Sequence, residues 1–242
     1  MKTKLFPLII VFLTAFLGSC STDVEPLHET VVITDPVDDD GEGGTSTGDY
    51  WPMAVENQWT FTLEGETQQP MKIIATEQIA GKTYYKYQNF LGMTSVEGSG
   101  FEGTVWTRKN GGVYFVRQEA FIPASDGNPS ITVEPMQIIV LKDFLNVGET
   151  WSQSVEQTTI IQGLPAIVTE VNLTGKILER DSSITIGDQT FESVIKVELI
   201  QNTQGTTTTN YYWFAKDIGI VKYQNLYPGF DTTYEISSYT VN

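Results

Sequence analysis

The 242-residue chain contains a single cysteine, Cys20, and a single histidine, His28. One cysteine cannot form an intramolecular disulfide, and one thiolate without other soft ligands makes a poor metal site. A catalytic thiolate also needs a base, but His28 lies in a stretch that has no strand or helix pattern. The scarcity of both residues therefore leaves nucleophilic triads and the usual zinc sites without their parts, and we expect no metal and no cofactor.

Basic residues are also scarce, with 14 Lys and Arg against 30 Asp and Glu and a formal net charge of −16. Nucleic-acid binding depends on Lys and Arg side chains that neutralise phosphates, and an acidic surface repels them. We therefore exclude nucleic acid as a partner. The acidity itself is explained by solubility and self-repulsion.

The N-terminus begins with two lysines, Lys2 and Lys4, followed by an apolar stretch that ends at Leu17. A positive start and a short apolar run are typical of a cleaved export signal. The sequence Leu17-Gly18-Ser19-Cys20 resembles a bacterial lipobox, in which the cysteine receives a diacylglycerol and signal peptidase II cuts before it. The resemblance predicts a signal peptide over residues 1–19, lipidation of Cys20 and attachment to a membrane through acyl chains. An ordinary secretory signal with an incidental cysteine is the alternative.

Residues 20–48 are polar and acidic and contain little that a core would bury, so we expect a lipid-anchored disordered tether. A calcium loop around Asp38 and Asp40 is disfavoured, because Pro36 and Thr47 stand where an EF-hand needs ligands. The acidic residues just after the lipid site resemble signals that send Bacteroidetes lipoproteins to the outer face of the outer membrane. We therefore expect a protein of the cell envelope, anchored to the outer membrane, with surface exposure left open.

From residue 49 to residue 242 the chain has the alternation of antiparallel β-strands. In residues 189–199, apolar side chains occupy one parity and charged ones the other, as a strand with one solvated face requires. Turn signals such as Gly187-Asp188 and Pro228-Gly229 separate such runs, and no segment after the signal peptide keeps a helical period. The sequence predicts one all-β domain, either a strongly curved meander sheet or an open barrel.

A weak internal repeat appears at an offset of 107 residues, where Trp106, Lys109 and Gly112 are matched by Trp213, Lys216 and Gly219. It suggests two related halves, at about residues 50–140 and 141–242. Chance matching among similar strands is the alternative.

Two motifs at the ends of this domain resemble uncharacterised Bacteroidetes lipoproteins. They are "YWPMAVENQWTF", which starts at Tyr50, and "YYWFAKDIGIVKYQN", which starts at Tyr211. The first departs from the family pattern, with Met53 in place of Leu and Glu56 in place of Gly. The resemblance implies an antiparallel, strongly curved sheet and brings no catalytic residues with it.

Carboxylates are the remaining candidates for catalysis. A glycoside hydrolase needs two of them across a cleft, and Glu97, Glu102, Glu134 and Glu170 are candidates for such a pair. Acids on the polar face of a strand are more often solvated. We therefore predict that the protein is not an enzyme.

The five tryptophans suggest either core packing or stacking on a sugar. We assign Trp59, Trp106, Trp151 and Trp213 to the core, and Trp51 to the barrel end, where it is a candidate ligand contact. Asp231-Thr232-Thr233 resembles the Bacteroidetes O-glycosylation motif, with Thr232 as acceptor. The function predicted is a non-catalytic envelope lipoprotein that binds a lipid, glycan or protein ligand or acts as a scaffold. The alternatives are a glycan-binding accessory lipoprotein and a carboxylate-dependent glycoside hydrolase.

Overall fold

The computed structural model describes residues 43–91, 101–125 and 127–242. The predicted signal peptide, Cys20 and most of the predicted tether lie outside these residues. Every regular element in the described part is a strand, so the all-β prediction is confirmed. No helix there is long and apolar enough to cross a membrane. The strands are β1 (Gln58–Leu63), β2 (Glu66–Thr67), β3 (Met71–Ile79), β4 (Lys82–Gln88), β5 (Glu102–Asn110), β6 (Val113–Ile122), β7 (Ile131–Lys142), β8 (Thr150–Ile161), β9 (Ile167–Ile186), β10 (Gln189–Thr203), β11 (Thr206–Ala215), β12 (Gly219–Tyr227) and β13 (Phe230–Thr240).

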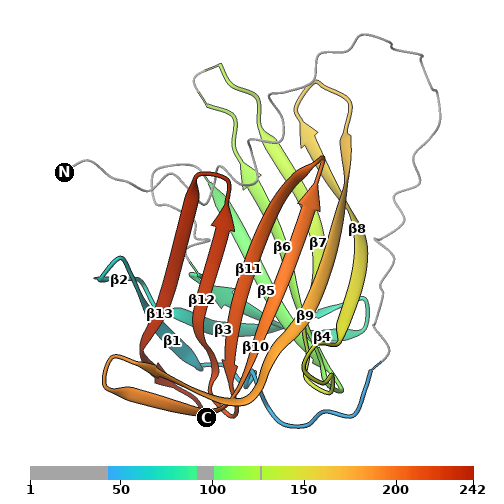
Figure 1. The fold of residues 1–242 in the computed structure, drawn as a ribbon. Helices are drawn as coiled ribbons and strands as arrows, with labels where there is room; N and C mark the ends of the chain where they lie inside the picture. The colour runs from blue at the N-terminus through green and yellow to red at the C-terminus, as the bar shows by residue number, and fades with distance from the viewer. Residues whose placement is uncertain (1–42, 92–100, 126) are drawn as a thin grey trace.

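Neighbouring strands pair antiparallel in chain order, and β13 then pairs with β1 from Thr240 opposite Gln58 to Tyr234 opposite Leu63 (Figure 1). This last pairing closes a barrel of twelve strands, and β2 is an extra strand on β1. The predicted antiparallel, strongly curved meander is thus present, and its ends pair with each other to close it into a barrel. Closure removes the exposed backbone edges that an open sheet would leave.

Hairpin turns lie where the turn signals predict them. Between β10 and β11, Gln204 and Gly205 both have positive φ, 49° and 82°, as a two-residue type I′ turn requires. The β6–β7, β8–β9, β10–β11 and β12–β13 hairpins lie at the upper end of the barrel in Figure 1. The β5–β6 and β11–β12 turns lie at the lower end.

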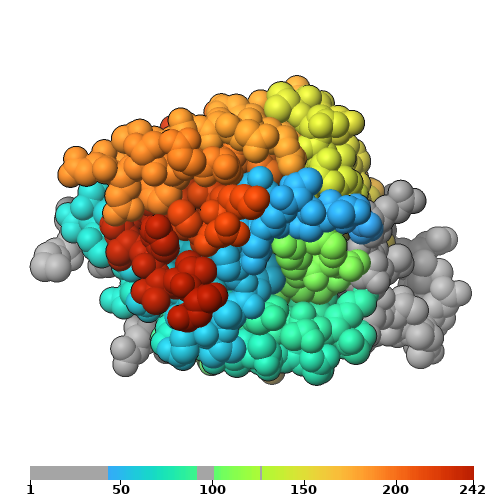
Figure 2. Space-filling model, turned by 90° about the horizontal axis from the view of Figure 1, so that it is seen from below, coloured from blue at the N-terminus to red at the C-terminus, as the bar shows by residue number. Residues whose placement is uncertain are grey.

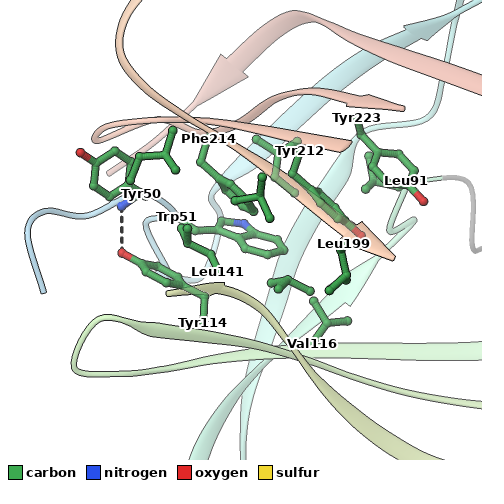
Figure 3. Packing of buried hydrophobic residues seen from close by; sticks show 14 of the residues in the cluster. Tyr50, Trp51, Leu91, Tyr114, Val116, Leu141, Leu199, Tyr212, Phe214 and Tyr223 are labelled. Carbon is green, nitrogen blue, oxygen red and sulfur yellow. Dashed lines mark hydrogen bonds between the residues drawn. The ribbon is translucent and has the colours of Figure 1, made fainter. Parts of the chain in front are cut away.

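Residues 43–57, called the N-terminal segment below, cross the lower end of the barrel, as Figure 2 shows in blue. Trp51 is fully buried there, and its ring lies 5.8 Å from Phe214, 5.9 Å from Phe90 and 6.2 Å from Tyr87. The backbone N–H of Tyr50 donates to the hydroxyl of Tyr114 at 2.9 Å (Figure 3). The segment therefore closes the lower end with large apolar side chains.

The same segment is fixed by Asp143, a fully buried residue just after β7. The carboxylate of Asp143 accepts hydrogen bonds from Ser46 Oγ at 2.7 Å and from the Thr47 N–H at 3.0 Å. Arg180 donates to the Asp143 carbonyl at 2.5 Å and to Thr47 Oγ1 at 2.8 Å. The sequence places the start of the domain at residue 49, but residues 44–48 are already bonded to the barrel.

The tryptophans divide between the two faces of the sheet. Trp59 and Trp151 belong to the interior core, as predicted. Trp106 lies outside that core, on β5, with the Lys86 ammonium 5.5 Å from its ring centre. Trp213, on β11, is only partly buried, and the Lys196 ammonium lies 4.9 Å from its ring centre. The core assignment therefore holds for Trp59 and Trp151 and needs correction for Trp213.

The barrel strands form two sets of six, one from β1 to β7 without β2 and one from β8 to β13. Trp106 and Trp213 lie in the fourth strand of their sets, and both rings are covered by lysine. This arrangement agrees with the proposed offset, although the repeat itself stays a prediction.

Candidate functional site

The buried face of β11 changes character along the strand. From the lower end upward, its buried side chains are Phe214, Tyr212, Asn210 and Thr208, each two residues from the next. Successive residues of one parity share a face of the sheet, so these four form one column inside the barrel. The column runs from aromatic side chains at the closed lower end to an amide and a hydroxyl at the upper end.

Other strands show the same gradient. On β10, Ile195, Val197 and Leu199 are followed upward by Gln201. The upper interior is thus surrounded by amides and hydroxyls, and none of the side chains in this set is charged. They are Gln118 on β6, Gln157 and Thr159 on β8, Thr169 on β9, Gln201 on β10, Thr208 and Asn210 on β11, Asn225 on β12 and Thr232 on β13.

A hollow of about 90 Å³ lies where the apolar and polar parts of the interior meet. Its apolar wall includes Leu91, Val116, Leu199, Tyr212 and Tyr223, which Figure 3 shows pointing into the same space. Its polar wall consists of five neutral side chains, and among the described residues none that lines it is charged. These five are Gln118, Gln201, Thr208, Asn210 and Asn225.

Asn210 is the centre of the polar wall. Its Oδ1 accepts hydrogen bonds from the Tyr223 hydroxyl at 2.8 Å and from Asn225 Nδ2 at 2.7 Å. With Oδ1 doubly occupied, the side chain offers its Nδ2 donor, while Asn225 offers its Oδ1 acceptor. The network thus fixes the orientation of two amides on the wall of the hollow.

The tyrosines around the hollow are neutral. Burial raises the pKa of Tyr212 and of Tyr223 above the ordinary value, and raises the pKa of Tyr234 to about 12. These phenols stay protonated throughout the physiological range. These three tyrosines therefore bring no charge to the hollow.

Two other hollows lie on the outside of the barrel and are open to solvent. One of about 540 Å³ is lined by Phe191, Glu192 and Tyr239, and one of about 490 Å³ by Asp49, Arg108 and Lys109, among others. Neither is enclosed by converging strands. Because binding sites are concave with a few convergent polar groups, the interior hollow is the better candidate.

The structure places the predicted site residues in different parts of the barrel. Trp51 is buried in the closed lower end, away from the polar wall, and it is one of the residues that line the hollow of about 490 Å³; its role as a ligand contact stays a prediction. Thr232 is 9% exposed and shares the buried face with its cross-strand partner Asn225. A glycosyltransferase would reach this hydroxyl only before the barrel closes, and O-glycosylation of Thr232 also stays a prediction.

The candidate carboxylates are not brought together at the hollow. Glu102 lies on β5, Glu134 on β7 and Glu170 on β9, and none of the three lines it. Glu170 accepts a hydrogen bond from Ser154 Oγ at 2.8 Å on the exposed side of the sheet. Glu97 lies outside the described residues. Within the described ranges no cluster of three His, Cys, Asp or Glu side chains is placed to hold a metal ion.

The fold and the site together define a closed antiparallel barrel with an internal hollow whose described polar lining is neutral. No protein-family model matches the chain, and no curated protein matches its sequence. Among solved structures, the chain is similar to a "putative lipoprotein" from Parabacteroides distasonis ATCC 8503, with 10% identity and a TM-score of 0.41. The match covers 81% of this chain and 100% of that chain. A TM-score this low carries no argument about function, and we base none on it.

Proposed function

We propose that the protein is a lipid-anchored protein of the cell envelope that binds a small ligand without transforming it. The observation that carries the proposal is the interior hollow, in which fixed neutral amides face an apolar wall. Acid–base and covalent catalysis depend on groups that titrate or attack near neutral pH, most often histidine, activated cysteine or paired carboxylates. The one histidine and the one cysteine precede the barrel in the sequence, and no carboxylate of the described residues lines the hollow.

The membrane is the first partner in this proposal, reached through acyl chains on Cys20 at the end of a tether. The lipobox and the acidic residues after it support anchoring in the outer membrane. Two or more acyl chains hold a protein stably, since each buried methylene contributes about 0.8 kcal/mol. The net charge of −16 supports the exclusion of nucleic acid.

The anchor is tested by Cys20→Ala. We expect the variant to lose incorporation of radiolabelled palmitate and to leave the detergent phase of a Triton extraction, because it has no thiol to receive the diacylglycerol. Ser21→Ala, at the neighbouring position, serves as the control and should keep both properties. Equal labelling of the wild type and Cys20→Ala would contradict lipidation.

The binding function is tested on residues 21–242, the mature chain without its lipid. We expect fractions of envelope polysaccharide or lipid to raise its thermal midpoint, with no product released in parallel hydrolysis assays, because ligands that bind only the folded state stabilise it. If the protein releases product and Glu102→Gln, Glu134→Gln or Glu170→Gln abolishes that activity, the protein is a hydrolase and the proposal of binding alone is wrong. If neither fraction shifts the midpoint, the proposed function fails.

A further inference from the structure

We propose that the hollow and the rim above it bind the neutral end of a glycan, with one sugar unit in the hollow and the next stacked on an aromatic pair. This inference rests on the proposed binding function and names its ligand class. It follows from three features: the neutral side chains of the described lining, the hydrogen-bonding groups they offer, and the aromatic rings at the mouth of the barrel.

The lining disfavours charged ligands. Of the side chains that the structure describes around the hollow none is charged, and the tyrosines beside it remain neutral. A carboxylate, phosphate or ammonium would enter without a partner of opposite charge and would lose its hydration. Uronic acids, phospholipid headgroups and nucleotides are therefore poor candidates.

The lining also disfavours an acyl chain. An alkyl chain would cover the amides of Gln118, Gln201 and Asn210 without hydrogen-bonding them, and an unsatisfied buried polar group is destabilising. The hollow measures about 90 Å³, whereas sites for drug-sized ligands span about 300–1,000 Å³. It therefore takes the end of a ligand rather than a long chain.

A hydroxyl-rich ligand matches the groups that the wall offers. Asn210 offers an N–H donor, Asn225 an acceptor, and Thr208 and Gln118 can each donate and accept. Sugar hydroxyls also donate and accept, so such a ligand can satisfy both kinds of group at once. The rings of Tyr212 and Tyr223, with centres 4.9 Å apart, add an apolar surface for the carbon face of a sugar ring.

The rim above the hollow supplies the second contact. Tyr223 opposes Tyr234, Asn225 opposes Thr232 and Tyr227 opposes Phe230, so these three cross-strand pairs follow one another upward on one face of β12–β13. The last pair is stacked, with ring centres 6.2 Å apart and planes at 29°, and Phe230 is 41% exposed. A stacked aromatic pair with one exposed ring, directly above a polar hollow, is the arrangement expected for a sugar chain that enters by its end.

Titration calorimetry on residues 21–242 tests the inference with the neutral disaccharides cellobiose, lactose, maltose and chitobiose. Glucuronic acid, palmitate and tetra-alanine are the comparison ligands. We expect at least one neutral disaccharide to bind and the three comparison ligands not to bind. Phe230→Ala should weaken that affinity about three- to tenfold through the lost ring contact. Thr208→Val and Gln118→Leu should each weaken it by up to about tenfold through one lost hydrogen bond.

The controls lie on the same strands and at the same end of the barrel. Phe121→Ala removes a ring of similar exposure, 38%, from the outer face of β6, and Thr209→Val changes the outward neighbour of Thr208. Both should bind as the wild type does. An equal loss of disaccharide affinity in Phe121→Ala and Phe230→Ala would overturn the assignment, and so would a failure of all four disaccharides to bind. Binding of palmitate or tetra-alanine alone would overturn the sugar class while leaving the proposed binding function intact.

Discussion

Gly175→Val is expected to lower the free energy of unfolding by about 3 kcal/mol, near the upper end of overpacking effects. Gly175 is buried on β9 opposite Trp151 on β8. A Cβ at this position would meet the Trp151 ring, whose large bicyclic side chain occupies that space inside the barrel and cannot step aside as a flexible chain end would. The interior is close-packed, so the ring has no free volume to enter.

Urea unfolding followed by tryptophan fluorescence and circular dichroism measures this effect. Thr174→Val places the same residue type on the exposed face of the same strand, where it replaces a hydroxyl by a methyl group, and should change stability by no more than about 0.5 kcal/mol. Trp151→Leu in the Gly175→Val background should recover part of the loss, because the two residues occupy the same space. Strictly additive effects of the two substitutions would show that the predicted clash does not exist.

Asp143→Ala is the second substitution for which we expect a large effect, a loss of about 3 kcal/mol in the free energy of unfolding. Asp143 is fully buried, and its carboxylate accepts hydrogen bonds from Ser46 Oγ, from the Thr47 N–H and, at 3.3 Å, from the Tyr114 hydroxyl. Hydrogen bonds to a charged group contribute about 1.5–3 kcal/mol each, and part of this returns when freed groups reach water. Limited proteolysis should also cut the variant first within residues 43–49.

A double-mutant cycle separates this network from a general defect. A chain that starts at Asp49 lacks Ser46 and Thr47, so Asp143→Ala should destabilise it less than it destabilises the chain that starts at Ser21. Asp188→Ala, in the exposed β9–β10 turn, is the control and should be nearly neutral. An equal loss from Asp143→Ala in both chains would contradict the role of the network in fixing the N-terminal segment.

The sequence predicts the strands well because their cause is local. Alternation on β10 and the turn at Gly187 need only neighbouring residues to be recognised. Barrel closure depends on Gln58 pairing with Thr240, and no local pattern marks that pairing. Sequence reasoning therefore predicted a curved meander sheet or an open barrel, and closure was seen only in the structure.

Composition also misassigned the end of the tether. Ser46 and Thr47 are polar and small, which is typical of a solvated linker, yet they bind a buried carboxylate almost a hundred residues away. The polar wall of the hollow is easier to recognise in the sequence. Residues 206–210, four threonines and an asparagine, put Thr208 and Asn210 on the same parity as Tyr212 and Phe214. Polar residues at core-facing positions are the signal that would have identified the site.

With the proposed anchor at one end of the chain and a bound ligand pulled at the other, the protein would come under tension, and the N-terminal segment determines where that tension acts first. The N-terminal segment lies at the lower end, opposite the hairpins that surround the hollow (Figures 1 and 2). A pull from the proposed anchor would load the bonds of residues 44–48 one after another, as in peeling, before it reached Trp51 and β1. Local openings of this kind need far less free energy than unfolding of the whole barrel. The segment would thus extend under force as a strain relief, while the binding end of the barrel keeps its shape.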